Sequence, residues 1–395
     1  MPNTAVRRVW LPAFYFLYFG AGACLAPFLS VYLRSIGLSP ANIGLLVSIP
    51  PVMMLVGAPV WSGIADAFRR HRPVIMIAAT SAALFALLIT HTTGVALLLF
   101  LIAGYAFSNA PIMPILDNAT LGILGENKSD YGRIRLWGGV AWGVIGPLIG
   151  VLTEHGGLHW PFYGYAFLML LALLVSTRVP LTPGELRQPF WHGIRSVVRD
   201  QRWYVFLGAV FTCGVALSAT TNFLFLYMQT MGARATMMGL SLMVATIAEL
   251  PFFVVTNWIV KRIGAPKMFL IGMAAFALRF ALYAVVQQPW AVLIVQVLHG
   301  PSFVAVWVAG VSYADSIAPP GMGATAQSIF GATLMGLGAA AGGVLSGALF
   351  GAVGAHWMYA ILALFVLVGL AIFWITNSRL ERRTGPRERI RSLNE

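Results

Sequence analysis

Apolar runs long enough to cross a membrane follow one another along almost the whole chain. A helix needs about 20 consecutive apolar residues to span the hydrocarbon core of a bilayer, and short polar stretches separate runs of this length. In the first half of the chain these runs cover residues 10–33, 42–65, 73–90, 95–121, 134–153 and 160–179. In the second half they cover 204–230, 237–260, 268–287, 290–314, 323–350 and 357–376. The pattern predicts an all-α membrane protein with about twelve transmembrane helices.

One polar segment interrupts this pattern in the middle of the sequence. Residues 180–202 separate the two sets of apolar runs and contain four arginines. We therefore expect an N-terminal six-helix bundle over residues 1–179, a cytoplasmic linker with an interfacial helix over 180–202, a C-terminal six-helix bundle over 203–378 and a basic cytoplasmic tail over 379–395.

The two halves share a short pattern at a fixed distance along the chain. Four residues of the first half recur 195 positions later in the second half: Tyr32, Gly37, Gly44 and Leu45 return as Tyr227, Gly232, Gly239 and Leu240. In both copies the pattern covers the turn between the first and second predicted helices. Parallel repeats of this kind place a substrate site at their interface near the membrane midplane. The repeat predicts two pseudo-symmetric six-helix bundles and a transporter.

Composition supports a membrane location and indicates the orientation. Only 9% of the 395 residues are charged and the mean hydropathy is +0.83, whereas soluble domains contain about 25% charged residues. Of the 25 Lys and Arg residues, Arg34 and Arg234 lie in loops of one face, Arg279 lies inside a span, and the other 22 belong to the opposite face. The positive-inside rule makes that face cytoplasmic. We expect a multi-pass protein of the inner membrane with both termini inside, whose net charge of +13 contacts lipid headgroups rather than nucleic acid.

A charged motif follows the second predicted helix. Asp66 is followed closely by Arg69, Arg70 and Arg72. The motif resembles the signature that members of the major facilitator superfamily carry between their second and third helices, although Ser62 stands where that signature has Gly. The resemblance implies that Asp66 and the three arginines form a conformational latch at the cytoplasmic helix ends. A basic loop that only sets the topology is the alternative.

Ionisable residues inside the predicted spans of the second half are candidates for function. A charge at the bilayer centre costs roughly 2.5–3.5 kcal/mol. Glu249, Arg279 and His299 all fall near the middle of their helices, so we expect them to form one cluster. A Glu beside an Arg and a His can bind or release a proton as its partners move, and we assign Glu249 and His299 to proton coupling and Arg279 to substrate binding. The alternative is a permanent ion pair that fixes helix packing.

Asp117 and Arg135 form a second candidate pair in the first half. Tyr131 begins an aromatic-Gly-x-x-Arg pattern that ends at Arg135 and is followed by a Trp-Gly pair and by Trp142. The segment resembles the fifth helix of lactose permease and, more closely, that of the phenylpropionate permease group and of nucleoside/proton symporters. The resemblance implies that Arg135 binds substrate, that Asp117 is its acidic partner and a proton carrier, and that Trp142 stacks on the solute. Snorkelling of Arg135 to the interface is the alternative.

The resemblance to the phenylpropionate permease group extends over nearly the whole chain, including the Tyr18-Phe19 pair and the stretch that ends at His299. Lactose permease carries a coupling carboxylate where Ser302 stands here, so any coupled proton falls to Glu249 or Asp117. We expect Tyr18 and Asn222 to complete a pocket that stacks on and hydrogen-bonds a planar solute.

These features predict a secondary active transporter that imports a small organic solute with protons by alternating access. Two arginines within the membrane favour an aromatic or other carboxylate as the solute. Proton-coupled efflux, which a partial Gly-Pro motif at Gly143–Gly150 indicates, and sugar or nucleoside symport remain open alternatives. We expect no enzymatic activity, no metal and no cofactor besides the proton gradient. The expected partners are the small-molecule substrate, protons and the bilayer, and we expect a monomer.

Overall fold

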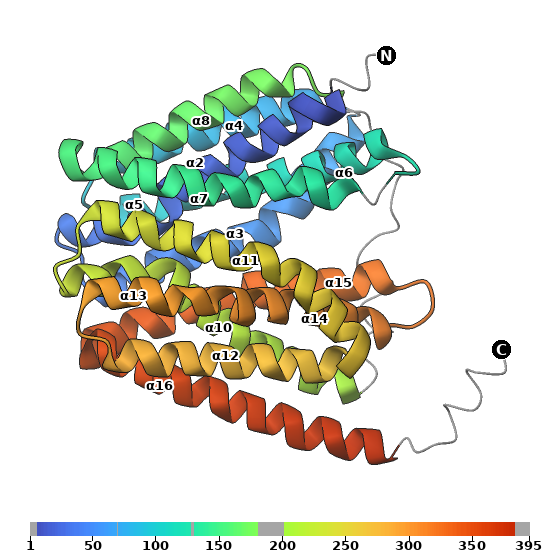
Figure 1. The fold of residues 1–395 in the computed structure, drawn as a ribbon. Helices are drawn as coiled ribbons and strands as arrows, with labels where there is room; N and C mark the ends of the chain where they lie inside the picture. Colours follow the sequence, from blue (N-terminus) through green and yellow to red (C-terminus); the bar gives the residue numbers. More distant parts are fainter. Residues whose placement is uncertain (1–5, 69, 128–129, 181–200, 384–395) are drawn as a thin grey trace.

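The computed structural model describes residues 6–68, 70–127, 130–180 and 201–383, and helices account for nearly all of them (Figure 1). The first half contains η1 (Val6–Trp10), α2 (Leu11–Ser35), α3 (Pro40–Ala67), α4 (His71–Ile89), α5 (Val95–Asn109), α6 (Ile112–Leu124), α7 (Tyr131–Gly156) and α8 (Trp160–Ser176). The second half contains α10 (Gln201–Thr230), α11 (Ala235–Ile263), α12 (Ala265–Val285), α13 (Pro289–Val295), η3 (Gln296–Leu298), η4 (Gly300–Val304), α14 (Ala305–Ser316), α15 (Gly323–Gly331), η5 (Ala332–Gly338) and α16 (Ala339–Arg383). No strand occurs within the described ranges.

The predicted all-α membrane fold is confirmed. Ten helical segments are long and apolar enough to cross a membrane. The last of them, Gly323–Leu380, contains two of the predicted runs, which meet at Gly354, where a φ of 81° interrupts the helix. The remaining predicted run is α8, a shorter apolar helix of 17 residues. Helix α16 continues to Arg383, so the predicted tail begins within a helix. Most of the predicted linker lies outside the described residues.

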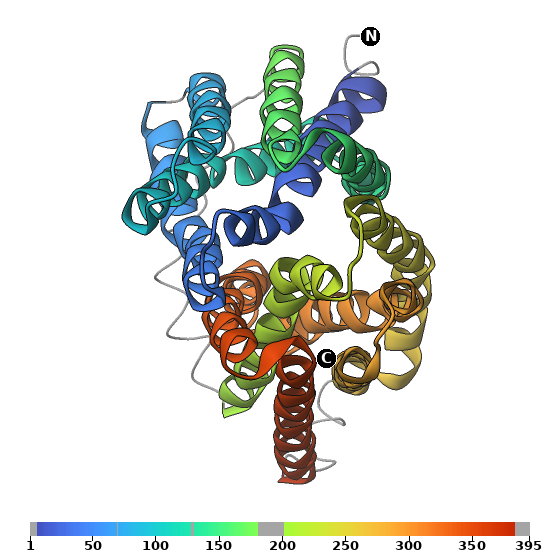
Figure 2. The same cartoon turned by 90° about the vertical axis from the view of Figure 1, so that its left-hand side faces the viewer.

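The helices of each half of the sequence pack together, and the two halves face each other (Figures 1 and 2). Within the first half, α2 packs on α7 and α8, and α4 packs on α5 and α8. Within the second half, α16 packs on α10 and α12. Contacts between the halves join α7 to α11, α3 to α16 and α2 to α10. These three helix pairs therefore hold the bundles together.

Glycines bring the backbones of the two halves close together. A Cβ atom on Gly239 of α11 would overlap the carbonyl oxygen of Gly146 in α7. A Cβ atom on Gly44 of α3 would lie 2.8 Å from Cα of Gly347 in α16. Small residues permit close helix contact inside membranes, where van der Waals packing drives association. Gly44 and Gly239 belong to the internal repeat, so the repeated positions serve the same purpose in both halves.

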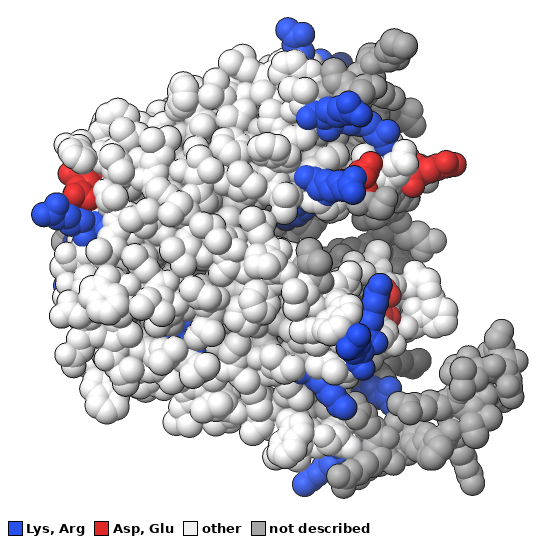
Figure 3. All heavy atoms as spheres, in the orientation of Figure 1, with Lys and Arg blue, Asp and Glu red and all other residues white. Residues whose placement is uncertain are grey.

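On the face shown in Figure 3, charged side chains gather at the two ends of the helices and leave a broad, nearly uncharged band between them. We call the end with Arg7, Arg133 and Arg262 the basic end, and the end with Arg34 and Arg234 the opposite end. The basic residues are far more numerous at the basic end, as the sequence predicts. The uncharged band is the part of the surface that suits the hydrocarbon core of a bilayer.

The helix that carries His299 is irregular in its middle. A short 3-10 segment, η3, ends just before His299, and the π-helical segment η4 begins just after it. Pro301, in the first turn of η4, has no backbone N–H to donate to the preceding turn. Irregular turns of this kind within helices are frequent at functional sites. His299 therefore lies between two irregular turns and not within a regular α-helix.

Candidate functional site

Glu249, Arg279 and His299 meet inside the second half, as their depth in the sequence predicts. They come from α11, from α12 and from the irregular segment between η3 and η4. Nε2 of His299 lies 2.7 Å from Oε1 of Glu249, and Nη1 of Arg279 lies 2.8 Å from Nδ1 of His299. His299 therefore bridges a cation and a carboxylate that do not touch each other directly.

The chemistry of the three groups determines where the proton of His299 lies. A guanidinium can only donate hydrogen bonds, so Nδ1 of His299 must accept from Arg279 through its lone pair. The remaining ring nitrogen, Nε2, then carries the proton and donates to Glu249, which is an acceptor when ionised. The arrangement consequently holds a neutral His299 between the two charges. A second proton can reach Nδ1 only if Arg279 moves away.

A second set of partners holds Arg279 in place. Its Nε donates to the hydroxyl of Tyr283 at 3.0 Å, and its Nη2 donates to Oε1 of Gln296. The Tyr283 hydroxyl also donates to Oε1 of Gln296 at 3.0 Å, and Nε2 of Gln296 donates to the carbonyl of Ser241 at 3.3 Å. Only 1% of Arg279 is exposed. Its role in substrate binding stays a prediction, because neutral partners and His299 surround it in this conformation.

The structure also brings Asp117 and Arg135 together, and Tyr15 contacts the same carboxylate. The hydroxyl of Tyr15 in α2 donates to Oδ1 of Asp117 at 2.5 Å and lies 3.3 Å from Oγ1 of Thr120. Nη1 of Arg135 lies 3.9 Å from the same carboxylate oxygen, beyond hydrogen-bond distance. The direct hydrogen bond to Asp117 thus comes from Tyr15, and the arginine forms a looser ion pair.

The guanidinium of Arg135 rests against aromatic rings. Its Cζ lies 5.0 Å from the ring centre of Phe19 and 5.9 Å from that of Tyr15. Among the described residues, its Nη1 is enclosed and has no hydrogen-bond partner. Tyr18 is 9% exposed and packs edge-on against Phe19. An arginine with a free donor beside aromatic faces is suited to bind a planar carboxylate.

Trp142 and Asn222 have other neighbours. Trp142 is half-buried and faces α2 at Gly22, where a Cβ atom would lie 3.8 Å from the indole ring. Nδ2 of Asn222 donates within α10 to the carbonyl and the hydroxyl of Ser218, at 3.2 and 3.1 Å. The placement of Trp142 is compatible with stacking on a solute, whereas Asn222 uses its amide donor locally.

The predicted latch has a different acidic pairing from the one expected. Oδ1 of Asp66 pairs with Nε2 of His71 at 3.0 Å. Arg72 donates instead to the carbonyls of Thr177 and Val179, which ties α4 to the end of α8. Arg70 precedes the first residue of α4, and Arg69 lies outside the described residues. His71 lies between Arg70 and Arg72 in the sequence, but the motif gave it no role.

Sequence reasoning also missed a polar contact at the opposite end. Oε2 of Glu154, in α7, accepts a hydrogen bond from the backbone N–H of Thr236 in α11, at 3.1 Å. Oε1 of the same residue lies 3.5 Å from Nη1 of Arg234. The contact joins the two halves. The sequence did contain a signal for this contact, because Glu154 is an acidic residue on a face that has few charges.

Comparison with known proteins identifies the class of this chain. The MFS_1 like family matches residues 8–361, and the chain belongs to this family. Maltose permease of Geobacillus stearothermophilus is 29% identical over 342 residues, which cover 85% of this chain and 86% of that protein. The probable 3-phenylpropionic acid transporter of Escherichia coli (strain K12) is 28% identical over 310 residues, which cover 77% of this chain and 81% of that protein.

Solved structures show the same fold. The nucleoside transporter NupG superimposes with a TM-score of 0.82 over 93% of this chain and 98% of that chain, at 19% sequence identity. The protein is therefore a membrane transporter of the major facilitator type and not an enzyme. The predicted resemblance is confirmed.

Proposed function

We propose that the protein is a proton-coupled symporter that imports a small organic anion, an aromatic or other carboxylate, by alternating access. The observation that carries this proposal is the chain of contacts from the buried Arg279 through a neutral His299 to Glu249. The bilayer and the proton gradient are its expected partners, and it needs no other cofactor. We place it as a monomer in the inner membrane, with the basic end and both termini in the cytoplasm.

The charges of this chain give a reason for coupling. With Glu249 ionised, the positive charge of Arg279 is balanced across His299. Protonation of Glu249 leaves the cation of Arg279 uncompensated inside the protein, and a buried charge without a partner is costly. An anion bound elsewhere in the same protein restores the overall charge balance. Proton binding and anion binding therefore favour each other, which is the thermodynamic requirement of symport.

Arg135 is the proposed docking point for the carboxylate of the solute. Its enclosed Nη1 without a hydrogen-bond partner would donate to a carboxylate oxygen, and the rings of Tyr15 and Phe19 would contact an aromatic solute. Asp117 competes for the same guanidinium at 3.9 Å. Protonation of Asp117 would remove that competition, so this pair supports a second route for coupling.

Uptake into proteoliposomes tests the proposal. Labelled 3-phenylpropionate and other aromatic carboxylates are supplied outside under an inward proton gradient, and we expect accumulation that an uncoupler abolishes. Glu249→Gln is expected to lose accumulation and to retain exchange of solute across the membrane. The matched control is Glu126→Gln, which changes an exposed carboxylate in the turn after α6. Absence of gradient-driven uptake across the whole panel would refute the proposed function.

Symport of a neutral sugar is the second candidate function. It is favoured by the likeness to maltose permease over 85% of this chain and by the aromatic rings around Arg135, since aromatic faces also pack against apolar faces of sugars. The same vesicles, supplied with labelled maltose or nucleosides on the outside, distinguish the two candidates. Uptake of maltose that carboxylates do not inhibit would favour the sugar.

A further inference from the structure

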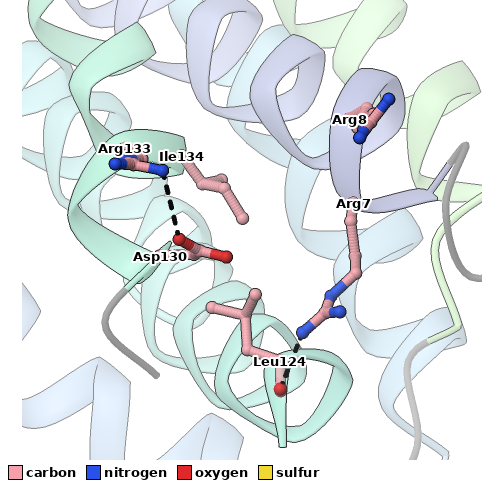
Figure 4. Close-up of a pocket in the computed structure, with 6 residues that line it drawn as sticks. All are labelled: Arg7, Arg8, Leu124, Asp130, Arg133 and Ile134. Atoms are coloured by element: carbon pink, nitrogen blue, oxygen red, sulfur yellow. Dashed lines mark hydrogen bonds and ion pairs between the residues drawn. The ribbon is translucent and has the colours of Figure 1, made fainter. Parts of the chain in front are cut away.

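A pocket at the basic end has the chemistry of an anion site. It has a volume of about 370 Å³ and is lined by Arg7, Arg8, Leu124, Asp130, Arg133 and Ile134 (Figure 4). The lining contains three arginines and one aspartate, so it is strongly positive. Ligand pockets in proteins begin at about 300 Å³. The pocket is therefore large enough for a compact charged group.

The arginines of this pocket come from two separate elements and are not all paired. Arg7 and Arg8 belong to η1, whereas Arg133 belongs to the first turn of α7. Nη2 of Arg7 donates to the carbonyl of Leu124 at the end of α6, at 2.7 Å. Its Nε is enclosed and has no hydrogen-bond partner among the described residues. An enclosed N–H without an acceptor is costly, and a bound anion would provide one.

The acidic residue of the pocket does not neutralise it. Oδ1 of Asp130 lies 3.6 Å from Nη1 of Arg133, and the two side chains are 47% and 88% exposed. Exposed ion pairs of this kind contribute about 0–1 kcal/mol. Arg133 can therefore leave Asp130 at little cost and turn toward an anion held by Arg7 and Arg8.

We propose that this pocket binds the phosphate group of an anionic ligand, for which the headgroup of a phospholipid and a soluble phosphate are the two sources. Phosphate suits the site because arginine forks match its oxygens in geometry and charge. Basic pockets between membrane helices bind lipid headgroups where they open at the bilayer surface. The pocket joins η1, α6 and the start of α7, so a bound phosphate holds these three elements together.

Binding measurements on the full-length protein test the site without relying on transport. Purified protein is placed in nanodiscs of phosphatidylcholine with increasing phosphatidylglycerol, and retained lipid is counted by native mass spectrometry. In a second arm, inorganic phosphate is added in neutral detergent and the melting temperature is followed, since a ligand that binds the native state raises it. The variants are the double variant Arg7→Gln/Arg8→Gln and the single variant Arg133→Gln. The control is Arg262→Gln, which removes a basic residue at the same end but in the other half.

We expect the double variant to bind phosphatidylglycerol about tenfold more weakly than the wild type and Arg262→Gln to bind it normally. A response to inorganic phosphate that the double variant loses, without lipid selectivity, would support the same site with a soluble ligand. The proposal is overturned if the variants bind both probes as tightly as the wild type. It is also overturned if Arg262→Gln loses as much affinity, because diffuse attraction would then explain the binding. If the double variant does not fold, Arg133→Gln still tests the site. The side chain of Arg133 is 88% exposed, so its replacement should not disturb folding.

Discussion

The carboxylate of Glu154, near the end of α7, accepts a hydrogen bond from the backbone N–H of Thr236 in the first turn of α11. The first N–H groups of a helix have no partner within the helix, and they form the positive end of its dipole. Arg234, the residue before α11, offers no side-chain hydrogen bond to cap it. Glu154 therefore supplies the cap from the other half of the transporter and fastens the two halves at the opposite end.

Glu154→Ala is expected to open the opposite end more often. Loss of a helix cap costs about 1 kcal/mol, which changes the ratio of two conformers about fivefold. Distances between spin labels at Val151 and Met237 measure the change. Arg234→Ala is the matched variant, because it removes only an ion pair whose arginine is 83% exposed and should shift the distances much less. Equal shifts in the two variants would contradict the capping role.

His299 should be replaceable only by a residue that both accepts and donates hydrogen bonds. His299→Phe removes the group that joins the buried Arg279 to Glu249. Removal of one partner from a buried charge network costs about 3–5 kcal/mol. His299→Gln keeps an acceptor and a donor and is expected to be clearly more stable. Chemical unfolding of the purified variants measures the difference. Similar stability of the two variants would indicate that the bridge contributes little.

Arg135→Lys tests the proposed docking of the carboxylate. Lysine keeps the positive charge but lacks the planar fork that binds two carboxylate oxygens. A hydrogen bond to a charged group contributes about 1.5–3 kcal/mol, so we expect KM for a carboxylate solute to rise about 10- to 100-fold, with uptake of neutral solutes unaffected. Arg262→Lys, at the same end, serves as the control. An unchanged KM in Arg135→Lys would mean that the solute binds elsewhere.

Tyr15→Phe should strengthen the pairing of Asp117 with Arg135. The hydroxyl of Tyr15 now occupies Oδ1 of Asp117 at 2.5 Å. Without it, the carboxylate is free to approach the guanidinium and to compete with the solute. We expect a severalfold rise in KM in uptake assays, and we expect the additional substitution Asp117→Asn to reverse it. The control is Tyr204→Phe, at a side chain that is 63% exposed. A KM of Tyr15→Phe equal to that of the wild type would exclude competition by Asp117.

The sequence predicts the depth of charged residues better than it predicts their partners. Rise along a regular helix is nearly constant, so Glu249, Arg279 and His299 could be placed at one level from their positions alone. Tyr283 and Gln296 could not be recognised as partners of Arg279 from the sequence. Both are uncharged, and their role depends on a tertiary contact with Arg279. Tyr283 does lie one helical turn after Arg279, a spacing that would have placed the two side chains on the same face.

The same limit applies to the helix ends. The motif around Asp66 predicts a polar connection but not its partner, since Asp66 has several basic neighbours and the path of the loop selects His71. The break between α5 and α6 at Ala110 and Pro111 was also not predicted, because the apolar run continues through it without change. The hydrophobicity of a segment indicates whether it lies in the membrane, but it does not indicate whether its helix is continuous.

The neutral His299 between Arg279 and Glu249 has a consequence for the membrane potential. For the proposed symport, the empty site carries one positive and one negative charge. The loaded site adds one proton and one monovalent anion, so its sum is unchanged. The potential contributes about 2.3 kcal/mol per 100 mV for each charge that crosses the membrane, and here neither the loaded nor the empty form moves net charge. Accumulation of the solute should then follow the pH difference alone and be indifferent to voltage.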